Sequence, residues 1–234
     1  MKEFNWKYAL KIFGVVACFI TFIVLAIIVY NTRFDPIGLD ANFRDFCYNI
    51  RGEEGGFGYW FFRIITEFGN FYVISVIVII VVIATKCDYR AILLALGILF
   101  AVMLNIGLKG LYMRERPVAE LRWMDEFSTS FPSGHATAAG FLYTFLMYIA
   151  YHSKLSKKAI NIWMTLCGLM IPLVMFSRTI LGVHYFTDVI AGFTVGIMVS
   201  CLCMLAYKLC IKYDFMTEGL FEKIKNSRKN KKDN

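Results

Sequence analysis

Charged residues are scarce in this sequence of 234 residues, in which Asp, Glu, Lys and Arg together make up 18%. Six long stretches contain none of them: Ile12–Thr32, Phe68–Thr85, Ala91–Leu108, Ala136–Tyr151, Ala159–Ser177 and Val189–Tyr207. Each is close to the roughly 20 residues that a helix needs to cross a bilayer, the fourth if it starts at Pro132. The hydrophobic content of 59% and mean hydropathy of +0.60 argue against a soluble helical bundle. The sequence predicts an all-α integral membrane protein with six transmembrane helices in a bundle.

The lysines and arginines are concentrated on one set of connections between these stretches. Most lie near the N-terminus, after the second and fourth stretches, and near the C-terminus, whereas the acidic residues favour the other connections. Because cytoplasmic loops are enriched in Lys and Arg, we expect both termini to be cytoplasmic. The formal net charge of +8 then reflects membrane topology and gives no reason to expect a nucleic-acid partner.

The chain is expected to form one domain. Residues 1–11 are a cytoplasmic lead, residues 12–210 the six-span domain, and residues 211–234 a basic cytoplasmic tail. Residues 33–67 form an extracytoplasmic loop in which aromatic and charged side chains are mixed, which predicts one amphipathic helix in the headgroup layer, ended by the glycines at 52, 55, 56 and 58. We interpret this loop as an interfacial anchor, and a lip for lipid entry is the alternative.

The cysteines and histidines are too dispersed along the sequence to indicate a disulfide framework or a zinc site. Of the seven cysteines, only Cys47 clearly lies on the extracytoplasmic side, so no disulfide framework is expected. Cys201 and Cys203 have no further ligands at zinc spacing, and no carboxylate cluster suits a two-metal centre. We therefore expect neither a metal nor a cofactor.

Two cations follow the third span. Lys109 closes this span, and Arg116-Pro117 comes seven residues later. If the helix persists to Glu115, this separation is close to two turns, and Lys109 and Arg116 share one face before Pro117 turns the chain away. Taken alone, such cations are better explained by side chains that extend into the headgroup layer at the start of a loop.

The fourth span opens with the sequence Pro132-Ser133-Gly134-His135. Pro and Ser at a helix entrance, followed by Gly, offer backbone N–H groups and the positive end of a helix dipole to an anion. His135 falls in the first turn. An ordinary helix cap with a chance histidine explains this segment when it is considered by itself.

A third polar group surrounds the connection between the fifth and sixth spans. Arg178 closes the fifth span and presents a planar guanidinium suited to phosphate. His184 and Asp188 are four residues apart at the start of the sixth span, so their side chains share a helical face. A carboxylate that accepts the proton of one imidazole nitrogen leaves the other nitrogen free to attack.

All three groups are expected at the same face of the membrane. Odd spans end, and even spans begin, on one side, which the cation distribution places outside the cell. Two of the three histidines are there, and His152 falls at the opposite end of the fourth span. Such a convergence of cations, histidines and a helix N-terminus indicates a functional site, because ionisable groups without a function would be scattered over both faces.

The converging groups suit phosphoryl transfer without a metal. The groups that can neutralise a phosphate are Lys109, Arg116, Arg178 and the N–H groups near Ser133 and Gly134. His184, oriented by Asp188, would attack phosphorus and form a phosphohistidine. His135 would protonate the leaving oxygen and then help to activate water.

The motifs resemble the three signatures of the type 2 phosphatidic acid phosphatase superfamily. They are Lys109-x6-Arg116-Pro117, Pro132-Ser133-Gly134-His135 and Ser177-Arg178-x5-His184-x3-Asp188, and the resemblance covers roughly residues 60–205. It implies a six-helix membrane core, a phosphohistidine at His184, His135 as the acid and Asp188 as the orienting residue. The phosphate contacts that it implies come from Lys109, Arg116, Ser133, Gly134 and Arg178. The six spans exclude the soluble vanadium haloperoxidase branch.

We therefore predict a metal-independent lipid phosphatase, a multi-pass protein of the cytoplasmic membrane with its active site on the extracytoplasmic face. Its expected substrate is a membrane lipid with a terminal phosphate: phosphatidylglycerophosphate, phosphatidic acid or undecaprenyl diphosphate. One alternative is a lipid phosphotransferase with the same intermediate, which passes the phosphate to an acceptor other than water. The other is a non-catalytic lipid-binding membrane protein.

Overall fold

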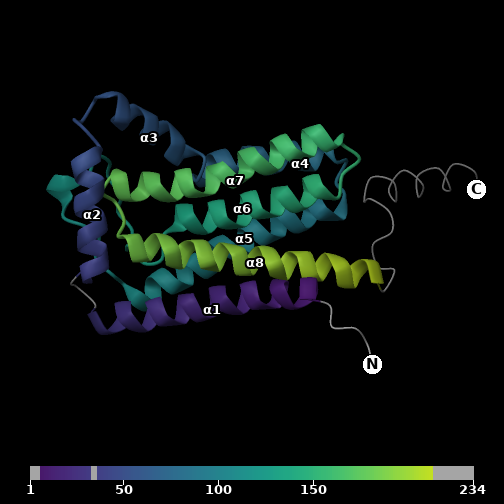
Figure 1. Cartoon of the computed structure of the whole chain (residues 1–234), viewed down its shortest axis with the longest axis horizontal. Coiled ribbons are helices and arrows are strands. Elements are labelled where there is room, and N and C mark those ends of the chain that lie inside the picture. The colour runs from purple at the N-terminus through teal and green to yellow at the C-terminus, as the bar shows by residue number, and fades with distance from the viewer. Residues whose placement is uncertain (1–5, 33–35, 213–234) are drawn as a thin grey trace, which may run out of the picture.

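The computed structural model describes residues 6–32 and 36–212, and every regular element among them is helical. The long helices run side by side, and one short helix lies across one end of the bundle (Figure 1). The elements are α1 (Trp6–Thr32), α2 (Gly38–Ile50), α3 (Phe57–Glu67), α4 (Phe71–Ala84), α5 (Tyr89–Tyr112), a 3-10 turn (Ala119–Leu121), α6 (Gly134–Tyr151), α7 (Lys157–Ile180) and α8 (Phe186–Lys212). The helix that lies across the end is α2. The predicted all-α architecture is confirmed.

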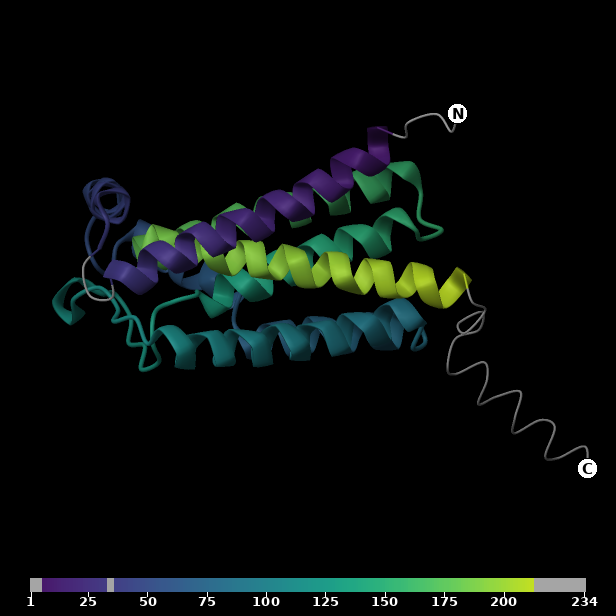
Figure 2. The ribbon, with the colours of Figure 1, turned by 90° about the horizontal axis from the view of Figure 1, so that it is seen from below.

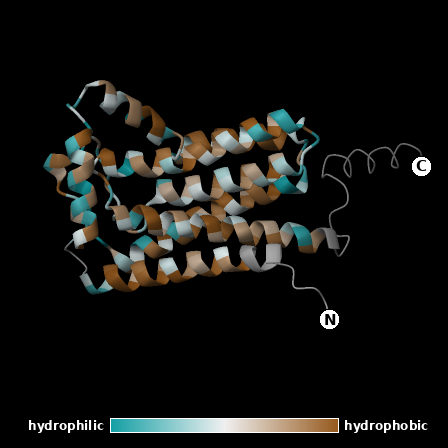
Figure 3. Ribbon diagram, viewed as in Figure 1, coloured by the Kyte–Doolittle hydropathy of each residue, from teal (hydrophilic) through white to brown (hydrophobic). Residues whose placement is uncertain are grey.

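The central helix of the bundle is α6, which packs against α4, α5, α7 and α8. Its fully buried side chains Phe141 and Phe145 belong to a core that includes Ile74 of α4 and Leu94 of α5. The outer helices are also apolar where they face away from the bundle, as the brown ribbon of α1 shows (Figure 3). Helices that are apolar both inside and outside the bundle are those that a bilayer surrounds.

The predicted count of six spans is met only in part. Four helices are long and apolar enough to cross a membrane, namely α1 from Ile12, α5, α7 and α8 to Cys210. The pair α3 and α4, bent by 50°, makes a fifth span if it is counted as one. The remaining predicted span corresponds to α6, which is not among these candidates because its first turns carry polar residues that other helices cover. Its crossing of the membrane stays a prediction.

The predicted loop of residues 33–67 contains two helices, although one amphipathic helix was expected. The first, α2, ends at Ile50, just before the predicted glycines, and α3 begins at Phe57. Gly52 and Gly55 separate them with φ values of 77° and 81°, a left-handed backbone that glycine adopts readily. The packing of α2 against α7 and α8, and of α3 against α7, holds both helices on the bundle. Residues 33–35 lie outside the described part of the chain.

Two glycines bring α8 into backbone contact with α6. A Cβ atom at Gly192 would lie 2.4 Å from Ser133 O, and one at Gly196 would lie 2.3 Å from Thr137 O. Only glycine fits at these positions, since the facing atoms belong to the backbone. The spacing Gly192-x-x-x-Gly196 therefore fixes the start of α8 beside the start of α6.

The first turn of α1 and the last turn of α8 lie at the same end of the bundle, opposite α2 (Figures 1 and 2). That both termini of the chain are cytoplasmic stays a prediction. Of the predicted lead, residues 6–11 belong to α1 and residues 1–5 lie outside the described part. Of the predicted tail, residues 211 and 212 end α8 and the rest is likewise not described.

Candidate active site

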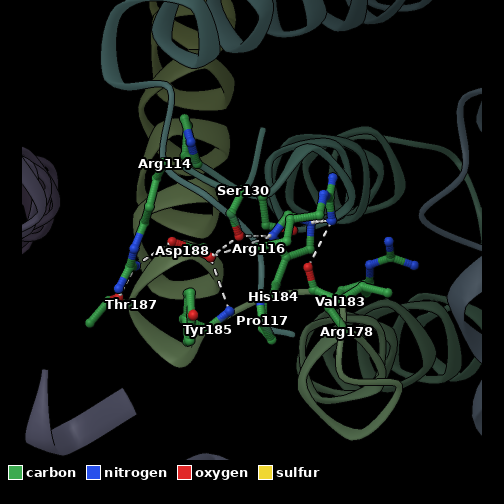
Figure 4. A network of polar contacts seen from close by, with 12 residues as sticks. Arg114, Arg116, Pro117, Ser130, Arg178, Val183, His184, Tyr185, Thr187 and Asp188 are labelled. Carbon is green, nitrogen blue, oxygen red and sulfur yellow. Dashed lines mark hydrogen bonds and ion pairs between the residues drawn. The ribbon is translucent and has the colours of Figure 1, made fainter. Parts of the chain in front are cut away.

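The polar residues of the three motifs meet at the end of the bundle that α2 covers. Lys109 lies in the last turn of α5, His135 in the first turn of α6, Arg178 in the last turn of α7 and Asp188 in the first turn of α8. His184 lies between α7 and α8, and Figure 4 shows the contacts around it. Segments distant in the sequence thus form one site.

His184 is held in a tight turn and is 3% exposed. Gly182 makes this turn with φ of 74°, and a Cβ there would lie 2.7 Å from Leu121 O. The imidazole lies between Arg116 and Ser130 (Figure 4), with Nε2 3.2 Å from Arg116 Nη1 and Nδ1 3.3 Å from Ser130 Oγ. Because a guanidinium only donates, Nε2 is the unprotonated nitrogen and Nδ1 carries the hydrogen. The lone pair needed for attack is therefore on Nε2.

Asp188 is fully buried and accepts hydrogen bonds from three directions. Ser130 Oγ donates to Oδ2 at 2.5 Å, Tyr185 N to Oδ2 at 3.0 Å, and Arg114 Nη1 to Oδ1 at 2.5 Å. Nδ1 of His184 lies 3.6 Å from Oδ2, beyond a direct hydrogen bond. The Ser130 hydroxyl completes the link, since it accepts from Nδ1–H and donates to the carboxylate. The predicted His184–Asp188 pair is thus connected through a third residue.

The expected extension of α5 to Glu115 is wrong. The helix stops at Tyr112, because the next residue turns into the left-handed conformation with φ of 44°. Lys109 and Arg116 nevertheless lie together, since Lys109 Nζ and Arg116 Nη2 both donate to Thr129 O, the latter at 3.4 Å. The loop before α6 gathers these two cations, and a shared helical face does not.

A carboxylate lies between two of the three predicted phosphate-binding cations. Glu126 Oε1 pairs with Arg178 Nη2, and Glu126 Oε2 lies 3.5 Å from Arg116 Nη2. Arg178 is fully buried and donates through Nη1 to Thr66 Oγ1 at 2.6 Å, while its Nε has no partner among the described residues. Arginines that converge on a carboxylate have the geometry for a phosphate. Arg116 and Arg178, held on one carboxylate beside His184, therefore form a candidate anion site.

The surrounding cations also set the protonation state of His184. Burial lowers the pKa of His184 well below the usual 6.5, and the charges of Arg116, Arg178 and Lys109 lower it further. Burial lowers the pKa of Arg116 to about 10, an effect that Glu126 opposes and Arg178 reinforces. At neutral pH the imidazole is therefore neutral and the Arg116 guanidinium beside it is charged.

Ser133, Gly134 and His135 form the start of α6. Ser133 Oγ accepts from Ala136 N at 3.4 Å and caps the helix, while the Ser133 N–H donates to Asp188 O at 2.9 Å. The backbone donor of Ser133 is thus engaged within the protein. The N–H groups of Gly134 and His135 precede the first intrahelical hydrogen bonds and point out of the helix N-terminus.

A cavity of about 330 Å³ lies beside His135. Its polar lining includes Asn70, Asn105, Glu126, His135 and Thr137, and its apolar lining includes Ile74 of α4 and Ile98, Ala101, Val102 and Ile106 of α5. The His135 ring packs against Gly69 at the bend between α3 and α4, where a Cβ would lie 3.1 Å from Cδ2. The cavity is therefore polar near the anion site and apolar between the helices.

Sequence reasoning missed four residues that complete the site: Asp40, Arg114, Glu126 and Ser130. Arg114 and Ser130 lie within three residues of the predicted Arg116 and Ser133, and this proximity was the available signal. Asp40 and Glu126 have no such signal, because their partners are distant in the sequence. In residues 6–32 and 36–212, no group of three or more His, Cys, Asp or Glu side chains has the arrangement to hold a metal ion.

The chain is similar to known proteins over a longer stretch than the three motifs. A profile of the PAP2 superfamily matches residues 90–212, slightly more than half of the chain. Phosphatidylglycerophosphatase B of Bacillus subtilis (strain 168) is 34% identical over 128 residues, which cover 54% of this chain and 55% of that protein. The chain thus spans about half the length of this curated relative.

Two solved structures have a similar fold. The crystal structure of a transmembrane PAP2-type phosphatidylglycerolphosphate phosphatase from Bacillus subtilis matches with a TM-score of 0.72 and 24% identity, over 84% of this chain and 96% of that one. The crystal structure of LpxE from Aquifex aeolicus matches with a TM-score of 0.60 and 24% identity, over 72% of this chain and 96% of that one. These likenesses establish a helical, multi-pass membrane fold.

Proposed function

Because this chain belongs to the PAP2 superfamily, we propose that it is an integral membrane lipid phosphatase that releases the terminal phosphate of a phospholipid or polyprenyl diphosphate. The observation that carries this proposal is the anion site formed by Arg116 and Arg178 next to the unprotonated Nε2 of His184. A nucleophile beside a site for a dianion is the arrangement that phosphoryl transfer requires.

In the proposed reaction the substrate phosphate displaces the Glu126 carboxylate from the arginines. The Nε2 lone pair of His184 forms a bond to phosphorus while the bond from phosphorus to the lipid oxygen breaks, and His135 gives that oxygen a proton. Water then attacks the phosphohistidine, with His135 accepting its proton, and inorganic phosphate leaves. Lys109, Arg116 and Arg178 neutralise the charge on the phosphoryl oxygens throughout.

The shape of the cavity supports a lipid as the substrate. Its polar part adjoins His135 and Glu126, and its apolar part lies along α4 and α5, where the side chains of Ile74, Ile98 and Ile106 offer hydrocarbon neighbours to an alkyl chain. A phosphate at the anion site would therefore carry its apolar group toward the membrane-facing helices. Phosphatidylglycerophosphate is the first candidate to test, since the Bacillus relative is named for it, followed by phosphatidic acid and undecaprenyl diphosphate.

Two further parts of the proposal concern the surroundings of the reaction. The distribution of lysines and arginines supports the cytoplasmic membrane as the location, with the site on its extracytoplasmic face. The cations and helix N-terminus at the site support a reaction without a metal, because they supply the positive charge that a metal would otherwise provide.

The test is release of inorganic phosphate by the purified protein from these three lipids in detergent micelles, with and without a chelator. We expect release from at least one lipid, undiminished by the chelator, and loss of activity in His184→Ala. His152→Ala is the matched control, because this exposed histidine lies at the other end of α6. Absence of release from all three lipids, or full activity of His184→Ala, would refute the proposal. Phosphate that appears only on an added acceptor lipid would identify a phosphotransferase.

A further inference from the structure

A carboxylate outside the three motifs is buried at the active-site end of the bundle. Asp40 lies in the first turn of α2 and has no exposed surface. Its Oδ1 accepts from Thr187 N at 2.9 Å, and its Oδ2 accepts from Thr187 Oγ1 at 2.9 Å and from Arg114 Nη2 at 2.7 Å. The carboxylate therefore lies at the N-terminal ends of both α2 and α8, where the helix dipoles favour a negative charge.

Arg114 connects this carboxylate to the active site. While Nη2 donates to Asp40, Nη1 donates to Asp188 Oδ1 at 2.5 Å and to Thr187 Oγ1 at 2.8 Å. The guanidinium also lies over the ring of Tyr185, with Cζ 4.3 Å from the ring centre. Figure 4 shows Arg114 extended toward Thr187 and Asp188. One buried arginine is thus shared by two carboxylates on α2 and α8.

The network continues to the proposed nucleophile. Asp188 Oδ2 accepts from Ser130 Oγ, which lies 3.3 Å from His184 Nδ1, and Ser130 N donates to Arg114 O at 2.8 Å. Asp40, Arg114, Asp188, Ser130 and His184 therefore form one continuous chain of polar contacts. Its first member lies on α2, outside the residues that match the family profile.

Burial of three charges together demands a full set of partners, because a buried charge without one is strongly unfavourable. Asp40 has all three of its contacts with Thr187 and Arg114, and Arg114 has no side-chain acceptors besides Thr187 and the two carboxylates among the described residues. The orientation of Arg114 therefore depends on Asp40, and Arg114 supplies the hydrogen bond that holds Oδ1 of Asp188, while Ser130 and Tyr185 hold Oδ2.

We propose that Asp40 and Arg114 are positioning residues for the phosphoryl transfer, with Asp40 fixing Arg114 and Arg114 fixing the Asp188 carboxylate that orients His184 through Ser130. This inference rests on the proposed function. It assigns α2 a part in the reaction beyond anchoring at the interface: the helix completes the support of the nucleophile. Neither residue touches the substrate, so the phosphate-binding cations remain in place when the support is removed.

The test is Asp40→Asn, which keeps the size of the side chain and removes its charge. Without the negative charge of Asp40, Arg114 moves toward Asp188 and displaces the Asp188 carboxylate. His184 then loses the fixed orientation that this carboxylate gives it through Ser130. We expect kcat for the best lipid substrate to fall about 10- to 100-fold, as a small misplacement of a reacting group does, with KM changed less than threefold. Asp45→Asn is the matched control, since Asp45 lies on the same helix with its side chain 61% exposed; its kcat should stay within twofold of the wild type.

Wild-type kcat in Asp40→Asn would overturn the inference, and so would a rise in KM at unchanged kcat, which would place Asp40 in substrate binding. If Asp40→Asn does not fold, Thr187→Val decides by the same criteria, since it removes only the hydroxyl shared by Asp40 and Arg114 and keeps the backbone N–H. The proposed function is judged separately, by phosphate release from the wild type and its loss in His184→Ala. If the wild type is active and Asp40→Asn and Thr187→Val both keep full kcat, the proposed function stands and the positioning role is refuted.

Discussion

At the scale of single residues, the neutral imidazole of His184 lies among the cations Lys109, Arg116 and Arg178, and three carboxylates, those of Asp40, Glu126 and Asp188, balance positive charge at the site. Asp188 and Asp40 are fully buried and permanently engaged. The side chain of Glu126 is 21% exposed and bridges Arg116 and Arg178 without other side-chain partners among the described residues. Glu126 is therefore the carboxylate that an incoming phosphate would displace.

The first prediction concerns this displacement. Glu126→Gln removes the charge that competes with the substrate phosphate, so KM for the lipid should fall by roughly three- to tenfold, the equivalent of about 1 kcal/mol in binding. The measurement is steady-state phosphate release. Asp125→Asn, an exposed neighbour in the same loop, should leave KM unchanged. An increase in KM for Glu126→Gln would show that this carboxylate assists substrate binding.

The second prediction concerns the cations. Arg116→Ala removes the guanidinium nearest to the nucleophile, and kcat/KM should fall about 10²- to 10³-fold, as is typical when one donor to a developing charge is lost. Arg44→Ala is the control, because the one ion pair of Arg44 with a described residue is with the exposed Asp45 on α2. A loss of less than threefold in Arg116→Ala would remove Arg116 from the phosphate site.

The third prediction follows from the lowered pKa of His184. Because the folded state keeps this imidazole neutral below 6.5, the unfolded state binds a proton that the folded state does not, and stability should decrease as pH falls from about 7 toward 5. The slope reaches about 1.4 kcal/mol per pH unit for one such group. Thermal unfolding in detergent should show a weaker pH dependence in His184→Gln than in the wild type, and the same dependence in His152→Gln. Equal slopes in all three proteins would contradict the lowered pKa.

At the scale of helices, the site depends on the close contact between α6 and α8. Gly192 and Gly196 have the small-residue spacing of closely packed membrane helices, and both positions touch the backbone of α6. This contact sets Ser133 beside Asp188, whose carbonyl accepts the Ser133 N–H. The geometry of the first turn of α6 is thus fixed by a helix that follows much later in the chain.

The fourth prediction tests this contact. Gly196→Ala would place a Cβ 2.3 Å from Thr137 O, which forces α6 and α8 apart and should destabilise the protein by about 1–3 kcal/mol. The expected readout is a lower temperature of thermal unfolding together with lower activity. Gly168→Ala in α7 is the control, since nothing lies within 4 Å of its Cβ position. An unchanged unfolding temperature in Gly196→Ala would show that the helices separate at little cost.

The helices themselves show where sequence reasoning succeeds. Long charge-free runs predicted the bodies of α1, α5, α7 and α8, because a span needs little beyond length and apolar character. The early end of α5 and the second helix of residues 33–67 were not predictable. Both depend on left-handed residues in loops, and on contacts with the bundle that local sequence does not encode.

At the scale of the whole molecule, the membrane is the constraint that made the site predictable. Alternation of spans across a bilayer required the three motifs to share one face, and the structure gathers them at one end of the bundle. The three motifs themselves gave the resemblance to the type 2 phosphatidic acid phosphatase superfamily, which the PAP2 profile match confirms. What alternation does not specify is which side chains pair within that face. The contact of Arg114 with Asp40 joins residues 74 positions apart, and it exists only because α2 folds over the end of the bundle.

The fifth prediction concerns the side of the membrane. In intact cells, a membrane-impermeant thiol reagent should label Phe127→Cys, because Phe127 is 99% exposed in the loop beside the site. Leu155→Cys, in the turn between α6 and α7 at the other end, should react only after the cells are opened. The reversed pattern would place the active site in the cytoplasm.

Trapping of the covalent intermediate is the most direct test of the proposed attack of His184 on the substrate phosphorus. The protein is mixed with a lipid that carries a labelled terminal phosphate, quenched in alkali within milliseconds to seconds and digested, and the labelled peptide is sequenced. We expect an alkali-stable, acid-labile phosphate on His184. This phosphate should be absent from His184→Ala and unchanged in His152→Ala. Active protein with no label on His184, or with the label on another residue, would contradict it.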